Sequence, residues 1–186
     1  MADLIVITGG CRSGKSDYAL RLAESRSMSR AMLATSPVTD AEMRRRIERH
    51  QQERRDRGWE TLEEQTDLAR VLRATPHEVI LIDCVTLWVN NLMYEAETAG
   101  VEIDEDDVAA RCREVIAAIE RRPGTVIAVT NEVGLGVVPE NAAARRFRDL
   151  AGRANQLLAA KATAVTLLCC GIPVQIKPNP HSVSNV

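Results

Sequence analysis

The chain has 186 residues, which suits one domain of ordinary size, and 45% of them are hydrophobic, which excludes an intrinsically disordered chain. The formal net charge is −2 and aromatic residues make up 3%, so we exclude a nucleic-acid binder that works through bulk positive charge or base stacking. The five cysteines form no C-x-x-C pair, which predicts reduced thiols in a cytoplasmic protein rather than a zinc site. We also expect no signal peptide and no membrane-spanning segment.

The first half of the chain alternates short apolar runs with amphipathic segments. Residues 4–8 are rich in β-branched side chains and lead directly into glycines, which is typical of a buried parallel strand. Thr39 and Glu42 have the spacing of a capping box at the start of a helix. In chain order we predict a strand at 4–8, a helix at 15–24, a strand at 31–34, a helix at 39–57, a helix at 63–73 and a strand at 79–83.

The second half continues the alternation. A helix is expected to begin at Asp104, because acidic residues fill its first turn and arginines its last, which suits the helix dipole. In chain order we predict a helix at 86–96, a helix at 104–122, a strand at 125–130, a Gly-rich loop at 131–139, a helix at 140–162, and a hairpin of strands 164–169 and 172–176 about Gly171. This order predicts an α/β fold, a mostly parallel sheet flanked by helices with a C-terminal hairpin, in a single domain at 1–177 with a loose tail at 178–186.

A phosphate-binding loop follows the first predicted strand. The pattern G-x-x-x-x-G-K-[ST] is met by Gly9, Gly10, Cys11, Arg12, Ser13, Gly14, Lys15 and Ser16, between a strand and a helix. The glycines allow backbone N–H groups to surround phosphate oxygens, and the lysine reaches the β- and γ-phosphates. We therefore predict a nucleoside triphosphate site in a P-loop (RecA-like) fold. Ser16 and Asp83 are candidate Mg²⁺ ligands, although Asp83 could also be an ordinary acid at a strand end.

A histidine on the predicted second helix is the other candidate for chemistry. His50 shares a helix face with Ile47 and Arg54, and Arg46 lies one turn before it. A neutral imidazole between arginines could attack phosphorus. The alternative is a structural histidine hydrogen-bonded to backbone, which the residues alone favour without closing either role. An Asn-Lys-x-Asp guanine motif is absent, which disfavours a switch GTPase.

Several long motifs in fixed order resemble one family. They are residues 8–16, 34–36, 46–50 followed by Trp59, 130–141 (TNEVGLGVVPEN) and 145–156 (RRFRDLAGRANQ). The chain resembles the bifunctional adenosylcobinamide kinase / adenosylcobinamide-phosphate guanylyltransferase family of cobalamin biosynthesis. The resemblance extends over the whole chain to Lys177. Two positions depart from the family pattern: Cys11 stands where Ala is frequent, and Asp83 stands where some relatives have Glu.

The resemblance implies two reactions on a corrinoid. A nucleoside triphosphate phosphorylates adenosylcobinamide, and His50 then attacks the α-phosphorus of GTP to form a guanylyl-histidine that passes GMP to the cobinamide phosphate. It implies Mg²⁺ as cofactor, GTP and ATP as substrates, and a homo-oligomer. Besides the phosphate loop and Asp83, the positions it implies for nucleotide binding are Thr35, Ser36, Pro37, Gln51, Gln52, Glu53, Arg54 and Glu63.

Two other functions remain open from the residues. A P-loop small-molecule kinase without the guanylyltransferase step would share the loop but form no covalent nucleotide. A nucleotide-dependent binding or regulatory protein would hydrolyse slowly without an acceptor. The preferred kinase donor, ATP or GTP, is not determined by the sequence. Asn131 and Glu132 follow a predicted strand and are candidate contacts for the corrinoid.

Overall fold

One mostly parallel sheet organises the molecule. The structure, a computed structural model, describes residues 2–36 and 57–178. Within these residues the sheet has seven strands in the order β3-β2-β4-β5-β1-β6-β7. All neighbouring strands run parallel except β7, which pairs antiparallel with β6. The strands are β1 (Asp3–Gly9), β2 (Arg30–Ala34), β3 (Glu60–Glu63), β4 (Val79–Asp83), β5 (Thr125–Val129), β6 (Ala164–Cys169) and β7 (Ile172–Lys177).

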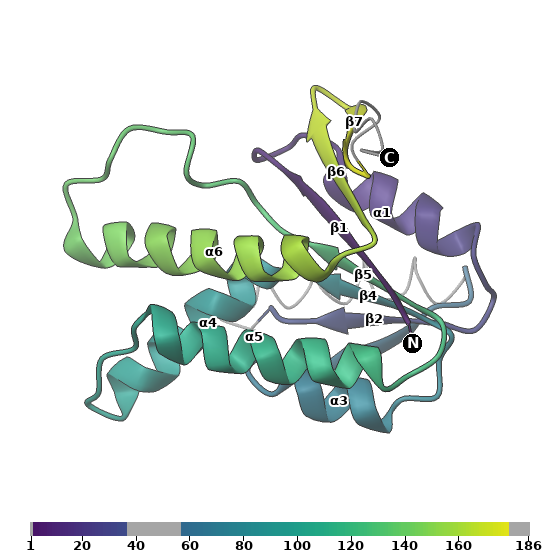
Figure 1. Cartoon of the computed structure of the whole chain (residues 1–186), viewed down its shortest axis with the longest axis horizontal. Coiled ribbons are helices and arrows are strands. Elements are labelled where there is room, and N and C mark those ends of the chain that lie inside the picture. Colours follow the sequence, from purple (N-terminus) through teal and green to yellow (C-terminus); the bar gives the residue numbers. More distant parts are fainter. Residues whose placement is uncertain (1, 37–56, 179–186) are drawn as a thin grey trace, which may run out of the picture.

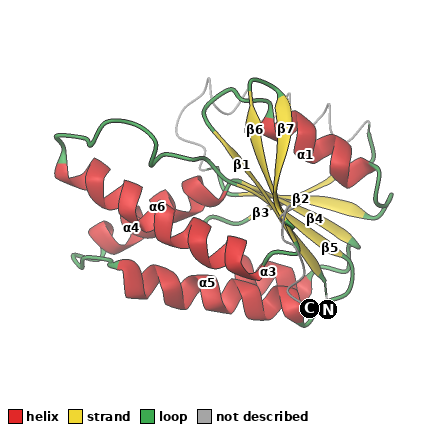
Figure 2. Cartoon of the chain, turned by 45° about the horizontal axis from the view of Figure 1, so that its top comes forward, coloured by secondary structure: helices red, strands yellow, loops and turns green. Residues whose placement is uncertain are grey.

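Helices lie on both faces of this sheet (Figures 1 and 2). Helix α1 contacts β1, β4 and β5 from one side. The other described helices gather on the opposite side, where α5 contacts both α3 and α6. Their bounds are α1 (Lys15–Glu24), α3 (Leu68–Ala74), α4 (Val85–Thr98), α5 (Glu105–Glu120) and α6 (Ala142–Lys161). The predicted α/β class with helices on both faces is confirmed.

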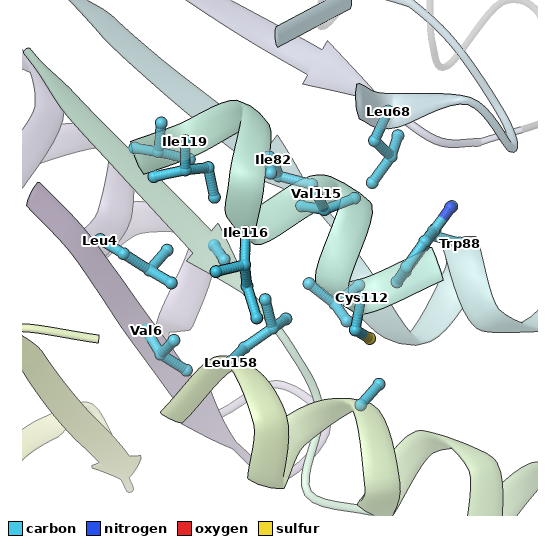
Figure 3. Packing of buried hydrophobic residues seen from close by; sticks show 14 of the residues in the cluster. Leu4, Val6, Leu68, Ile82, Trp88, Cys112, Val115, Ile116, Ile119 and Leu158 are labelled. Carbon is cyan, nitrogen blue, oxygen red and sulfur yellow. The ribbon is translucent and has the colours of Figure 1, made fainter. Parts of the chain in front are cut away.

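The alternation of side chains along each strand divides the core into two parts. In β1, Leu4 and Val6 belong to the cluster on the side of α3 to α6, whereas Ile5 and Ile7 belong to the cluster on the side of α1. Strands that are buried on both faces therefore have unbroken apolar sequences. Figure 3 shows the larger cluster, in which Cys112 of α5 lies among aliphatic side chains. None of the described helices combines the length and apolar character needed to cross a membrane.

The predicted helix at 63–73 is wrong in its first turn. Residues Glu60–Glu63 form strand β3, and the helix begins only at Leu68. Glu64 Oε1 accepts hydrogen bonds from the backbone N–H groups of Thr66 and Asp67, each at 3.0 Å, which fixes a turn. Asp67 then caps α3 by accepting from Arg70 N at 3.0 Å. The helix therefore starts after its cap and not at Glu63.

Most other predicted elements are confirmed within a residue or two. Helix α6 begins at Ala142, two residues later than predicted, because the Asn141 side chain accepts from Ala144 N at 3.0 Å and caps the helix. Asp104 caps α5 in a capping box with Asp107. The C-terminal hairpin turns at Cys170 and Gly171 as expected. The predicted helix at 39–57 lies outside the described residues, apart from Arg57. Residues 179–186 of the predicted tail lie outside them as well.

Candidate active site

The candidate site lies along the edge of the sheet where the parallel strands end. The strand register places Val129 level with both Ile7 and Asp83. It places Ala34 level with both Asp83 and Glu63. Four strand spacings separate β3 from β1, which is about 19 Å at about 4.8 Å per strand. Asp83 is thus close to the loop after β1, whereas Glu63 lies at the far end of the same edge.

The phosphate loop has a backbone that its glycines make possible. Gly9 has φ 148°, and a Cβ added there would lie 2.4 Å from the carbonyl oxygen of Leu168 on β6. Gly14 has φ 90° and forms the N-cap of α1 without a side-chain hydrogen bond. The first N–H groups of α1 therefore point into the loop with the positive end of the helix dipole. This arrangement is suited to hold phosphate oxygens.

Lys15 lies inside this loop. It is 7% exposed, and its Nζ donates to Gly10 O at 2.6 Å and to Ser13 Oγ at 3.5 Å. Burial lowers the pKa of Lys15, and the nearby Cys11, Cys84 and Asp83 act in the opposite direction. A polyphosphate in the loop would supply negative charge to an ammonium group that has lost much of its hydration.

Two oxygen-bearing side chains near Lys15 fit a magnesium ion. Ser16 follows Lys15 in the first turn of α1, and Asp83 ends β4. Among the described residues, no three His, Cys, Asp or Glu side chains gather as a metal cluster. Mg²⁺ is usually held by one or two protein oxygens together with substrate phosphates and water, so a sparse set of this kind is what a nucleotide-bound ion requires.

Thr35 connects the ends of two strands. It is fully buried, and its Oγ1 accepts from Cys84 N at 2.9 Å and lies 3.0 Å from Cys84 O and 3.1 Å from Asp83 O. Asn91 Nδ2 donates to Thr35 O at 2.7 Å. The Thr35 hydroxyl thus links the end of β2 to the backbone on which Asp83 is carried.

The other predicted residues divide into two groups. The structure brings together the phosphate loop, Asp83 and the end of β2 with Ser36, and it places Glu63 exposed at the end of β3. Pro37, His50, Gln51, Gln52, Glu53 and Arg54 lie outside the described residues.

A pocket of about 610 Å³ opens beside the phosphate loop. Polar and apolar side chains share its wall, which is typical of a small-molecule site. Its lining residues are Cys11, Cys84, Thr86, Leu87, Asn90, Asn131, Glu132, Val133 and Phe147. Cys11 belongs to both the loop and the pocket, so a molecule in the pocket lies next to a phosphate on the loop.

Hydrogen bonds position the polar wall of this pocket. Asn131 Nδ2 donates to Thr86 Oγ1 at 2.8 Å, and Asn155 Nδ2 donates to Asn131 O at 3.2 Å. Glu132 N donates to Gly9 O at 3.1 Å, which joins the pocket to the phosphate loop. The sequence points to Asn131 and Glu132 at this wall but not to Thr86. Its position just after β4 was an available signal, because ligands bind outside the carboxyl ends of parallel strands.

The hairpin of β6 and β7 supports the loop from the other side. Gly171 N donates to Ser13 O at 3.0 Å, and a Cβ on Gly14 would lie 3.4 Å from Gly171 Cα. The tip of the hairpin is thus in van der Waals contact with the phosphate loop.

Known proteins are similar to this chain over nearly all of its length. Residues 5–176 match the model of the cobinamide kinase / cobinamide phosphate guanyltransferase family. The bifunctional adenosylcobalamin biosynthesis proteins CobU of Escherichia coli (strain K12) and of Salmonella typhimurium are each 43% identical, over 94% of this chain and 99% of the relative. The bifunctional adenosylcobalamin biosynthesis protein CobP of Pseudomonas aeruginosa is 39% identical, over 97% of this chain and 99% of the relative. The chain therefore belongs to the cobinamide kinase / cobinamide phosphate guanyltransferase family.

Proposed function

We propose that this protein phosphorylates adenosylcobinamide with a nucleoside triphosphate and then transfers GMP from GTP to the phosphate it has made. Membership of the family supports both reactions, and so do the names of the bifunctional relatives. The observation that carries the proposal is that the phosphate loop shares Cys11 with the 610 Å³ pocket. A phosphate donor on the loop and an acceptor in the pocket would lie side by side there.

In the kinase step the loop holds the donor and the pocket holds the acceptor arm. Backbone N–H groups of the loop and the ammonium of Lys15 bind the β- and γ-phosphates. The acceptor hydroxyl oxygen forms a bond to the γ-phosphorus and loses its proton to solvent, and the bond to the β–γ bridging oxygen breaks so that the nucleoside diphosphate leaves. Ser16 and Asp83 would hold Mg²⁺, which neutralises charge on the phosphates. The pocket is large enough for the aminopropanol arm, with Asn131 and Glu132 as its polar contacts, and the corrin ring stays outside it.

In the second step His50 acts as the nucleophile. Its imidazole nitrogen bonds to the α-phosphorus of GTP and pyrophosphate leaves, after which a phosphate oxygen of cobinamide phosphate displaces the histidine. Glu63 would accept hydrogen bonds from the guanine base. Thr35, Ser36, Pro37 and the run from Gln51 to Arg54, with Gln52 and Glu53, are the remaining proposed contacts. Support for these positions is the family resemblance.

Intact-mass measurement after incubation with GTP tests the covalent step. We expect the wild-type protein to gain one GMP and the His50→Ala variant to gain none. His77 offers a matched control, because its ring contacts Thr75 and Glu60 at the opposite end of β3, and His77→Ala should still be labelled. Absence of label on the wild type would leave a kinase alone, and label on His50→Ala would move the nucleophile elsewhere.

We also propose that the protein is a cytoplasmic homo-oligomer. All five cysteines are free thiols, which fits a reducing compartment. Exposed apolar side chains gather on the loop after β5 and on β7, which would suit contacts between copies. They include Leu135, Val137, Val138, Ile172 and Val174. Sedimentation equilibrium would measure the oligomer, and a monomer at micromolar concentration would contradict this proposal.

A further inference from the structure

Two adjacent thiols lie at the tip of the β6–β7 hairpin. Cys169 ends β6 and Cys170 begins the turn, and both side chains are exposed. The S–H of Cys169 donates to Cys170 Sγ at a separation of 4.0 Å. By contrast, Cys112 is buried in the core. The proposed reactions use neither tip thiol, and exposed thiols are the ones that oxidants can reach.

This tip is part of the support of the phosphate loop. The residue after the pair, Gly171, donates its backbone N–H to Ser13 O at 3.0 Å. Just before the pair, the carbonyl oxygen of Leu168 would lie only 2.4 Å from a Cβ added to Gly9. The pair is therefore bracketed by two contacts with the loop. In both overall views the hairpin lies beside α1 and the end of β1 (Figures 1 and 2).

Closing a bond between these two sulfurs requires the turn to change. The sulfurs must approach from 4.0 Å to about 2.05 Å. Because the residues are neighbours, the ring includes the backbone between them, and Cys170 starts from a left-handed conformation with φ 52°. The backbone of Cys170 leads directly into Gly171, so its rotation displaces the N–H that reaches Ser13.

We propose that Cys169 and Cys170 form a redox modification site, closed by a low-molecular-weight disulfide such as oxidised glutathione, that weakens nucleotide binding at the phosphate loop. One protein thiolate attacks the small disulfide and releases one small thiolate. The second protein thiolate then attacks the mixed disulfide and releases the other. The two protein thiols lose two protons and two electrons, and the small disulfide is reduced to two thiols.

The hydrogen bond between the thiols couples the two groups. The pKa of Cys169 is raised by its hydrogen bond to Cys170 and by the charge of Cys170, so Cys169 keeps its proton longer. Disulfides of this kind are typical of redox sensing when they occur in reducing compartments.

Binding of α,β-methylene-GTP before and after oxidation by oxidised glutathione tests this site, because the analogue cannot lose pyrophosphate. The wild type should lose two hydrogen atoms in the peptide that contains both cysteines. Its Kd should rise by about five- to tenfold, the effect of losing about one hydrogen bond, and a reductant should restore it. Cys169→Ser and Cys170→Ser should each bind as the reduced wild type does, before and after treatment.

Three results would overturn the proposal. One is a wild-type peptide that keeps both thiols while the oxidant modifies other cysteines. Another is a closed disulfide with an unchanged Kd. The third is an equal rise in Kd for the wild type and both serine variants, which would show that closure of the bond between Cys169 and Cys170 is not the cause. Since the assay measures binding of a nucleotide without an acceptor, it does not depend on the guanylyl transfer proposed above.

Discussion

Replacing Gly9 by alanine should destabilise the protein far more than the same change at the adjacent Gly10. Gly9 has φ 148°, and its added Cβ would lie 2.4 Å from Leu168 O and 2.8 Å from Ser13 Oγ. The Ser13 side chain can rotate away. Leu168 O cannot, because Leu168 is in β6 and is paired in register with Gly9. The methyl group therefore forces β1 and β6 apart where the phosphate loop begins.

The magnitude follows from two separate costs. A residue other than glycine in this region of φ costs about 1–3 kcal/mol, and overpacking against immobile backbone adds about 1–3 kcal/mol. We expect a loss of about 3 kcal/mol in the free energy of unfolding. For a chain of this size, that lowers Tm by about 6 to 12 °C.

Urea unfolding of the nucleotide-free protein measures this cost. Gly10→Ala is the matched control, because Gly10 is not among the residues with positive φ and its added Cβ meets no atom within 4 Å. It should unfold within about 0.5 kcal/mol of the wild type. If Gly9→Ala is as stable as Gly10→Ala, the close approach of β1 and β6 is not what requires a glycine at position 9.

Three further predictions concern the core, a helix end and the pocket. Burial raises the pKa of Cys112 to about 12 from 9.0, so the folded state keeps this proton longer than the unfolded state. The contribution of this proton to the free energy of unfolding is complete below about pH 9 and falls by about 1.4 kcal/mol per pH unit from there toward pH 12. Cys112→Ala should reduce this alkaline slope in urea unfolding. An identical slope in the variant would contradict the assignment. Asp104→Ala removes a side chain that accepts from two backbone N–H groups at 2.9 and 3.0 Å, and should cost about 1 kcal/mol in the same assay, at least twice the cost of Asp106→Ala. Asn131→Ala removes the 2.8 Å hydrogen bond to Thr86 and should lower kcat/KM for cobinamide by about tenfold; an equal loss of nucleotide affinity would place Asn131 in the donor site instead.

The sequence predicts the buried strands well and the edge strand poorly. Strands β1, β4 and β5 are covered on both faces, so their sequences are unbroken apolar runs that are readily recognised. Strand β3 lies at the edge and its four residues are only partly buried or exposed. It is held to β2 by backbone pairing, which leaves little trace in the choice of side chains. That is why its last residue, Glu63, was predicted to start a helix.

The site divides in a similar way. The phosphate loop is contiguous, and its spacing alone predicts a strand, a tight turn and a helix, all of which are confirmed. The pocket beside it is assembled from α4, the loop after β5 and α6, with Thr86, Asn131 and Phe147 brought together by the fold. No local sequence pattern predicts that residues so far apart in the chain lie together, so only the pocket residues directly after a strand could be predicted.

The place of β1 in the sheet has a consequence for synthesis of the protein. The first strand of the chain lies between β5 and β6, and the turn after β6 contacts the loop that follows β1. A ribosome must therefore release residues up to the C-terminal hairpin before the loop near the start of the chain has its neighbours. A nascent polypeptide should bind GTP only late in translation, because its N-terminal strand has no sheet partners until then.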